Sequence, residues 1–150
     1  MSEASQQLAE ASAGRMYADD LASRGLGMEI ESVAPGRAVL RMPVRADMVN
    51  GHDICHGGFI FTLADSAFAF ACNTYGLVTV AKGASIEFVR PAQRGDTLRA
   101  EAKEISRGAR TGIYDVEVRR QDGKLIACFR GSSFGSDRPI IPREEEATET

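Results

Sequence analysis

Residues 57–75 read GGFIFTLADSAFAFACNTY, which is the longest apolar run in the chain. The run is too long for an ordinary strand and is rich in Ala, Phe and Leu, so we predict a helix. Apolar residues lie all round this helix, and most of its surface should therefore be buried. Gly76 follows directly and suits the left-handed position after a helix end. One buried helix thus forms the centre of the predicted fold.

Alternating apolar and polar residues on both sides of this helix predict strands. Before it, Met28–Val33 and Arg37–Val44 flank the turn signal Ala34-Pro35-Gly36 and form a predicted hairpin. After it, further strands are expected at about 77–90, 96–107, 111–121 and 124–134. Antiparallel strands need an element that covers one of their faces. We therefore predict an α+β fold in which an antiparallel sheet wraps around the long helix.

Length and charge indicate one globular domain with short extensions. The 150 residues are enough for a single hydrophobic core. We expect an N-terminal helical segment over 1–24, the main domain over 25–136 and a disordered acidic tail over 137–150. The net charge of -3 argues against nucleic acid or an anionic membrane as a partner. No secretory signal is evident, and no apolar run approaches the ~20 residues that span a bilayer, so a cytoplasmic location is expected.

Cysteine and histidine usage does not indicate a disulfide framework or a metal site. The chain has three cysteines and no CxxC spacing, so we interpret them as reduced thiols, at least two of them packed as small hydrophobes. His52 and His56, with Asp53 between them, are three candidate ligands on one short loop. No further cluster supports them, and we predict neither a metal nor a cofactor.

Asp65 is the single charged residue within the apolar helix. A lone carboxylate on a buried helix costs several kcal/mol unless it is paired, hydrogen-bonded or neutralised. Asp65 could accept hydrogen bonds from backbone or hydroxyl groups, face a wet edge, or serve in catalysis. Its isolation among apolar residues favours the catalytic interpretation.

The helix start, His56-Gly57-Gly58, has features of an anion-stabilising site. The first N–H groups of a helix lack partners within the helix and lie at the positive end of its dipole. Two glycines allow another group to approach the backbone closely. Such amides form oxyanion holes, which stabilise negative charge on a reacting carbonyl oxygen. A tight junction between loop and helix would use the same glycines equally well.

Gly57 and Asp65 are too far apart along one helix to act on the same atom. Their separation is roughly 12 Å at the usual helical rise, whereas a reacting carbonyl needs base and donor within roughly 3 Å. Two antiparallel copies of the helix across a two-fold axis would bring Asp65 of one subunit near Gly57 of the other. We therefore predict a composite site at a dimer interface.

Residues 50–73, NGHDICHGGFIFTLADSAFAFACN, resemble the signature of the hotdog-fold thioesterases, and most closely that of the phenylacetate-degradation thioesterase (PaaI) family. ASIEFVRPA at 84–92 and GKLIA at 123–127 fit the same family, and the resemblance covers about residues 26–134. It implies a hotdog fold, a dimer with a continuous sheet and usually a tetramer of two dimers. It also implies hydrolysis of aryl- or arylacetyl-CoA, of the phenylacetyl- or hydroxyphenylacetyl-CoA type, without a metal.

The resemblance assigns roles to four residues of the motif. The family's catalytic carboxylate maps onto Asp65, its oxyanion amide onto Gly57, and its loop Asn and pre-glycine His onto Asn50 and His56. Asp65 would act as general base on a water or attack the thioester directly, and the sequence leaves both routes open. Some relatives use a Ser or Thr on the next strand, where this chain has Ala81.

CoA carries phosphates, which require Arg or Lys. The candidate cations are Arg90, Arg107, Arg110 and Lys82, of which Arg107 and Arg110 lie together in a predicted reversal between strands. Two other functions compete with hydrolysis. One is a hotdog dehydratase acting on hydroxyacyl thioesters, and the other is a non-catalytic acyl-CoA-binding module.

Overall fold

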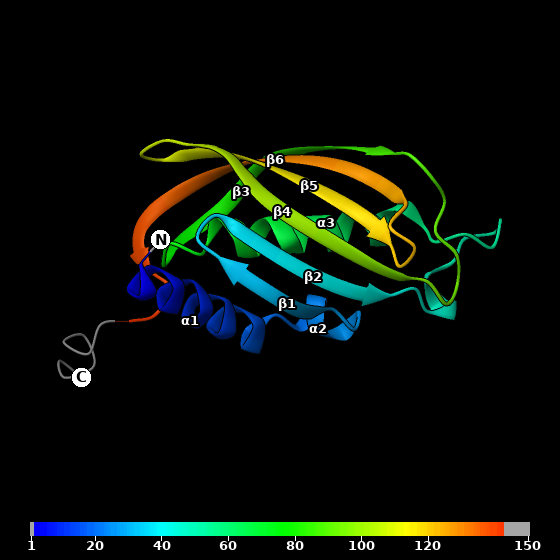
Figure 1. Cartoon of the computed structure of the whole chain (residues 1–150), viewed down its shortest axis with the longest axis horizontal. Helices are drawn as coiled ribbons and strands as arrows, with labels where there is room; N and C mark the ends of the chain where they lie inside the picture. The colour runs from blue at the N-terminus through cyan, green and yellow to red at the C-terminus, as the bar shows by residue number, and fades with distance from the viewer. Residues whose placement is uncertain (1, 143–150) are drawn as a thin grey trace.

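The computed structural model describes residues 2–142, and it contains one antiparallel sheet that curves around a central helix (Figure 1). The six strands lie in the order β1-β2-β4-β5-β6-β3. The elements are α1 (Glu3–Asp19), α2 (Leu21–Gly25), β1 (Glu29–Ala34), β2 (Arg37–Pro43), the short 3-10 helix η1 (Ala46–Met48), α3 (Gly57–Cys72), β3 (Leu77–Phe88), β4 (Thr97–Arg107), β5 (Thr111–Arg120) and β6 (Leu125–Pro139). The predicted α+β architecture and each predicted strand are confirmed.

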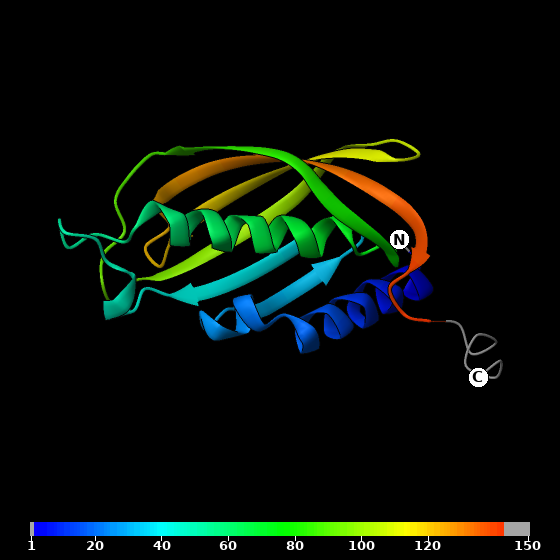
Figure 2. The same ribbon diagram turned by 180° about the vertical axis from the view of Figure 1, so that it is seen from behind.

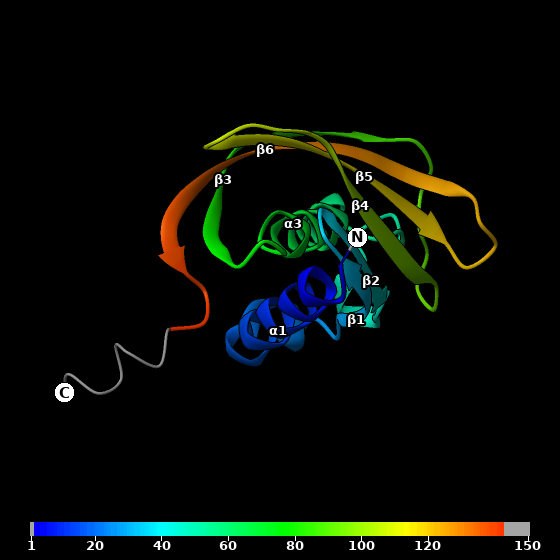
Figure 3. The same cartoon turned by 60° about the vertical axis from the view of Figure 1, so that its left-hand side comes forward.

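Helix α3 lies in the concave side of the sheet (Figure 3). Leu63, Ala67 and Phe68 are fully buried, and the Phe68 ring packs against Phe129 of β6 with ring centres 5.9 Å apart. A Cβ at Gly131 would lie 2.8 Å from this ring, so only glycine lets the helix sit this close to the sheet. The packing holds α3 at a set depth and presents its opposite side away from the strands.

Helix α3 ends at Cys72, before the predicted end at Tyr75. The Asn73 side chain donates to the carbonyls of Ala69 at 2.8 Å and Thr79 at 2.9 Å, and accepts from the Thr79 N–H at 2.9 Å. These bonds tie the helix end to the start of β3. Gly76 then reverses the chain at a φ of 84°, which confirms its predicted role.

Two helices occupy the N-terminal segment, for which the sequence indicated helical structure over 1–24. Helix α1 starts at Glu3 with Ser2 as its cap, and α2 follows it. Tyr17 donates its hydroxyl to the Met28 carbonyl at 2.7 Å, which ties α1 to the chain before β1. The buried face of α1 consists of the small residues Ala9, Ser12 and Ala13, and for that reason the apolar pattern of this helix is weak.

Strand β3 is an edge strand that pairs with β6 alone among the described strands (Figure 2). The pairing runs from Phe88 opposite Ala127 to Leu77 opposite Pro139. Strand β6 continues to Pro139, three residues beyond the expected end of the main domain at residue 136. The rest of the predicted tail, residues 143–150, lies outside the described residues.

Candidate active site

Asp65 lies on the side of α3 that faces away from the core. Thr62, Asp65 and Ala69 follow one another at helical spacing and are all partly exposed. Within residues 2–142, the Asp65 carboxylate has no hydrogen bond or ion pair. Partial burial raises its pKa above the ordinary 3.8. An unpaired carboxylate with a raised pKa is suited to take a proton or to attack a carbonyl.

His56 caps the start of α3 and determines which amides are free. Its Nδ1 accepts from the Gly58 N–H at 2.9 Å, and its carbonyl accepts from the Phe59 N–H at 3.0 Å. The Gly57 N–H meets no acceptor among the described residues. One free amide thus remains at the positive end of the helix dipole, as an oxyanion donor requires.

Asn50 shapes the loop before α3. Its Oδ1 accepts from the His52 N–H at 2.9 Å, and its backbone N–H donates to the Ile54 carbonyl at 2.8 Å. Because the side-chain oxygen is used within the loop, the Nδ2 amide is the atom left to contact a substrate. Neighbouring Asp53 pairs with Arg94 at 2.7 Å. In the part of the chain that the structure describes, no group of three His, Cys, Asp or Glu residues is placed to hold a metal.

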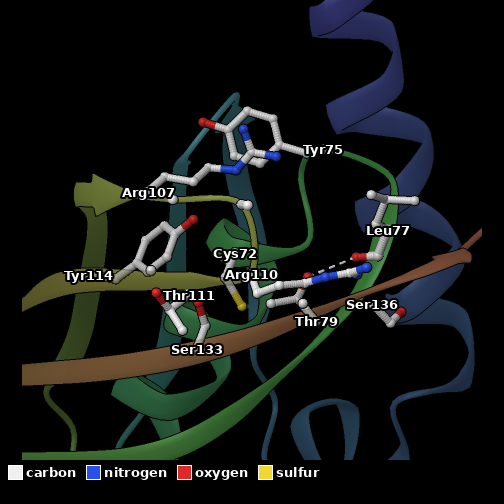
Figure 4. Close-up of a pocket in the computed structure, with 14 residues that line it drawn as sticks. Cys72, Tyr75, Leu77, Thr79, Arg107, Arg110, Thr111, Tyr114, Ser133 and Ser136 are labelled. Carbon is white, nitrogen blue, oxygen red and sulfur yellow. Dashed lines mark hydrogen bonds between the residues drawn. The ribbon is translucent and has the colours of Figure 1, made fainter.

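The four candidate phosphate ligands do not gather at one place. Arg107 and Arg110 lie on the turn between β4 and β5 and line a pocket near the end of α3 (Figure 4). The exposed Lys82 lies on β3. Arg90 donates to the Leu125 carbonyl at 3.0 Å, beyond the end of β3. Only Arg107 and Arg110 therefore remain together as candidates for one binding surface.

This pocket combines cations with hydroxyl and thiol groups. The Arg107 guanidinium lies 3.6 Å from the centre of the Tyr75 ring, and Arg110 pairs with Asp137 at 2.8 Å. Other lining residues are buried Cys72 and Ser133. Burial raises the pKa of the Cys72 thiol to about 12, so the thiol stays protonated at neutral pH. Cys55 is also buried and Cys128 is exposed, which confirms two packed thiols.

Comparison with known proteins identifies the family. A model of the thioesterase superfamily matches residues 52–127. The chain belongs to the thioesterase superfamily. This thioesterase is 49% identical over 118 residues to the acyl-coenzyme A thioesterase PaaI of Escherichia coli K12, a match that covers 79% of this chain and 84% of that protein.

Solved structures support the assignment of this chain to the thioesterase superfamily. The E. coli PaaI protein from the phenylacetic acid degradation operon matches with a TM-score of 0.88 and 45% identity, covering 89% of this chain and 97% of that one. A variant of PaaI from Thermus thermophilus matches with a TM-score of 0.74 and 43% identity, covering 77% of this chain and 98% of that one. A thioesterase protein from Streptococcus pneumoniae, solved with coenzyme A, matches with a TM-score of 0.72 and 25% identity. This match covers 75% of this chain and 88% of that one. The predicted hotdog fold and the predicted enzyme class, a thioester hydrolase, are confirmed.

Phe88 lies beside a candidate site residue, and the sequence reasoning missed this contact. A Cβ on Gly57 would lie 2.9 Å from the Phe88 ring, so the ring lies against the α-carbon of Gly57. The one sequence signal was Gly57 itself, which has no side chain to fill that space.

Among residues 2–142, no helix combines the length and the apolar composition that a membrane span requires.

Proposed function

We propose that this thioesterase hydrolyses aryl- or arylacetyl-CoA, of the phenylacetyl- or hydroxyphenylacetyl-CoA type, to the free acid and CoA in the cytoplasm. Aromatic-compound degradation is the proposed setting. The relative from E. coli is named an acyl-coenzyme A thioesterase, and its solved structure is described as part of a phenylacetic acid degradation operon. The observation that carries the proposal is Asp65, a carboxylate without a partner among residues 2–142, on the outward side of the helix whose Gly57 amide likewise meets no acceptor there.

The proposed site is shared between two copies of the chain. Positions 57 and 65 are eight residues apart on α3, roughly 12 Å along the axis. Neither residue lines any of the five main pockets that the described residues of one chain form. Two antiparallel α3 helices about a two-fold axis would pair the Asp65 carboxylate of each subunit with the Gly57 amide of the other, giving two sites per dimer.

The edge strand β3 supports this dimer. It is 12 residues long, and most of its residues are exposed, including Val80 at 58%. A long exposed edge strand presents unpaired N–H and C=O groups that a second strand can bind. Pairing of β3 with its copy would join two sheets into one and bring the two α3 helices side by side. Two dimers would then form the proposed homotetramer, for which exposed Ile105 and Ile113 offer apolar surface on the outer face.

The proposed reaction begins when the thioester oxygen accepts a hydrogen bond from the Gly57 N–H. The Asp65 carboxylate either removes a proton from water as the water attacks the carbonyl carbon, or attacks that carbon itself. The second route gives a mixed anhydride, which water then hydrolyses. In both routes the C–S bond breaks and CoA leaves as a thiolate that takes up a proton. The negative charge that grows on the oxygen is stabilised by the amide and the helix dipole.

His56 and Asn50 have supporting roles in this proposal. Because Nδ1 of His56 accepts from Gly58, the neutral ring carries its proton on Nε2. That N–H would donate near the departing sulfur. The Nδ2 group of Asn50 would orient the attacking water or the thioester. Arg107 and Arg110 would bind CoA phosphate groups from their shared turn, with Arg90 and Lys82 as further candidates.

The test is release of free thiol from a panel of acyl-CoA substrates, with Asp65→Asn measured beside the wild type. Fastest turnover of phenylacetyl- or hydroxyphenylacetyl-CoA, lost in the variant, is the expected result. Dehydration of hydroxyacyl-CoA without thiol release would instead support a dehydratase. Tight binding of aryl-CoA without any turnover would support a binding module.

A further inference from the structure

The place of a side chain at Gly57 is taken by the ring of Phe88. A Cβ built on Gly57 would lie 2.9 Å from Cζ of Phe88 and 3.3 and 3.4 Å from its two Cε atoms. The outer edge of the ring therefore points at the α-carbon of Gly57. Gly57 is absent from the residues with positive φ, so its backbone conformation does not demand glycine. Glycine is required at this position because the Phe88 ring approaches so closely.

The backbone holds Phe88 in this position while its ring remains half exposed. Phe88 is the last residue of β3 and pairs with Ala127 of β6. The next N–H, of Val89, donates to the Ile126 carbonyl at 2.7 Å. Phe88 is nevertheless 52% exposed. One part of the ring contacts Gly57, and the rest is free to contact another molecule.

We propose that Phe88 is a positioning residue that forms the wall of the oxyanion site and holds the thioester carbonyl against the Gly57 amide. This inference rests on the proposed function and adds a residue to it. An apolar wall beside the amide excludes water and lowers the local dielectric, which strengthens the hydrogen bond to the developing oxyanion. Because the wall borders the thioester and not the acyl tail, it acts on aromatic and straight-chain acyl-CoA alike.

The first test compares Phe88→Ala and Phe88→Leu with Phe134→Ala, because Phe134 is 51% exposed on β6. We expect Phe88→Ala to lower kcat about tenfold or more on both phenylacetyl-CoA and a straight-chain acyl-CoA, with a smaller change in KM. Phe88→Leu should retain most of the activity, and Phe134→Ala all of it. Thermal melts confirm that each variant is folded. Wild-type kcat in Phe88→Ala would overturn the inference.

The second test uses the contact itself. Gly57→Ala should lose roughly a hundredfold in kcat, because the new methyl group meets the Phe88 ring and displaces the amide. Removing the ring in Gly57→Ala/Phe88→Ala should restore activity about tenfold above Gly57→Ala. A double variant no better than Gly57→Ala contradicts the inference. If the wild type itself releases no thiol from any acyl-CoA, the proposed function fails instead, so the two failures are distinguishable.

Discussion

The backbone N–H of Gly58 donates to Nδ1 of His56 at 2.9 Å, so one exposed side chain caps α3 and keeps its second nitrogen available. Replacing this residue separates the two roles. His56→Ala should lower the free energy of unfolding by about 1 kcal/mol through loss of the cap. His56→Asn should keep nearly all stability, because Asn is a favourable N-cap.

Both His56 variants lack the Nε2 donor, and both should lower kcat by about 10- to 100-fold. Denaturant unfolding and thiol-release kinetics on the same preparations check the two effects. Full kcat in His56→Asn would reduce His56 to a structural cap.

The Asp65 carboxylate, which has no partner among the described residues, predicts the dependence of activity on pH. Hydrolysis needs the ionised form, so kcat/KM should fall as the pH drops through the Asp65 pKa. Burial raises that pKa, and the acid limb should therefore be centred above 3.8. Asp65→Asn should lose about 10³-fold in kcat at neutral pH. An acid limb at or below 3.8 would contradict this assignment.

The same pKa direction sets the sign of a stability effect. The folded protein binds the Asp65 proton more tightly than the unfolded chain does. The contribution of Asp65 to the free energy of unfolding is therefore fully present below its pKa in the unfolded chain. This contribution is lost as the pH rises through its pKa in the folded protein. Asp65→Asn should be at least as stable as the wild type at neutral pH, and its advantage should vanish under acid conditions. Urea unfolding at several pH values measures this difference.

A composite site predicts recovery of activity when two inactive variants are mixed. In a dimer of one Asp65→Asn subunit and one Gly57→Val subunit, one site carries both changes and the other carries neither. Random exchange of equal amounts should regenerate about a quarter of wild-type activity. Each variant alone is the control, and re-mixing requires prior dissociation of the subunits. A mixture as inactive as its components would show that the site is not shared.

The Gly131–Phe68 contact predicts a loss of stability without a change in the site. A Cβ at position 131 would lie 2.8 Å from the buried ring, so Gly131→Ala should cost about 1–3 kcal/mol through overpacking. Gly14→Ala is the matched control, because a Cβ there meets nothing within 4 Å and Gly14 lies inside α1. That change should stabilise by up to about 1 kcal/mol. Melting temperatures that shift in the same direction for both variants, relative to the wild type, would contradict the packing argument.

The stacking of Arg107 on Tyr75 leaves the cation exposed at the pocket mouth and predicts a role in CoA affinity. Arg107→Ala should raise KM several-fold with little change in kcat, and the effect should shrink at high salt because the charges are exposed. Arg119→Ala is the control, since Arg119 pairs with Glu117 on β5, away from this turn. Equal KM values for wild type and Arg107→Ala would remove this cation from the binding surface.

The chain by itself determined the features that depend on local periodicity. The buried helix, the strands and the turn at Gly76 follow from repeats of 3.6 and 2 residues and from backbone preferences. The isolation of Asp65 was equally visible, because one charge in an apolar helix is a local anomaly. These features were predicted correctly, although helix α3 ends at Cys72 and not at Tyr75.

Only the tertiary structure decided which distant segments meet. Neighbouring positions in the chain do not specify that β3 pairs with β6, that Phe88 lies against Gly57, or that Arg107 stacks on Tyr75. Such contacts depend on strand register and on the depth at which α3 packs, which Gly131 controls. Register and depth result from the packing of the whole core, so no local pattern of residues could reveal them.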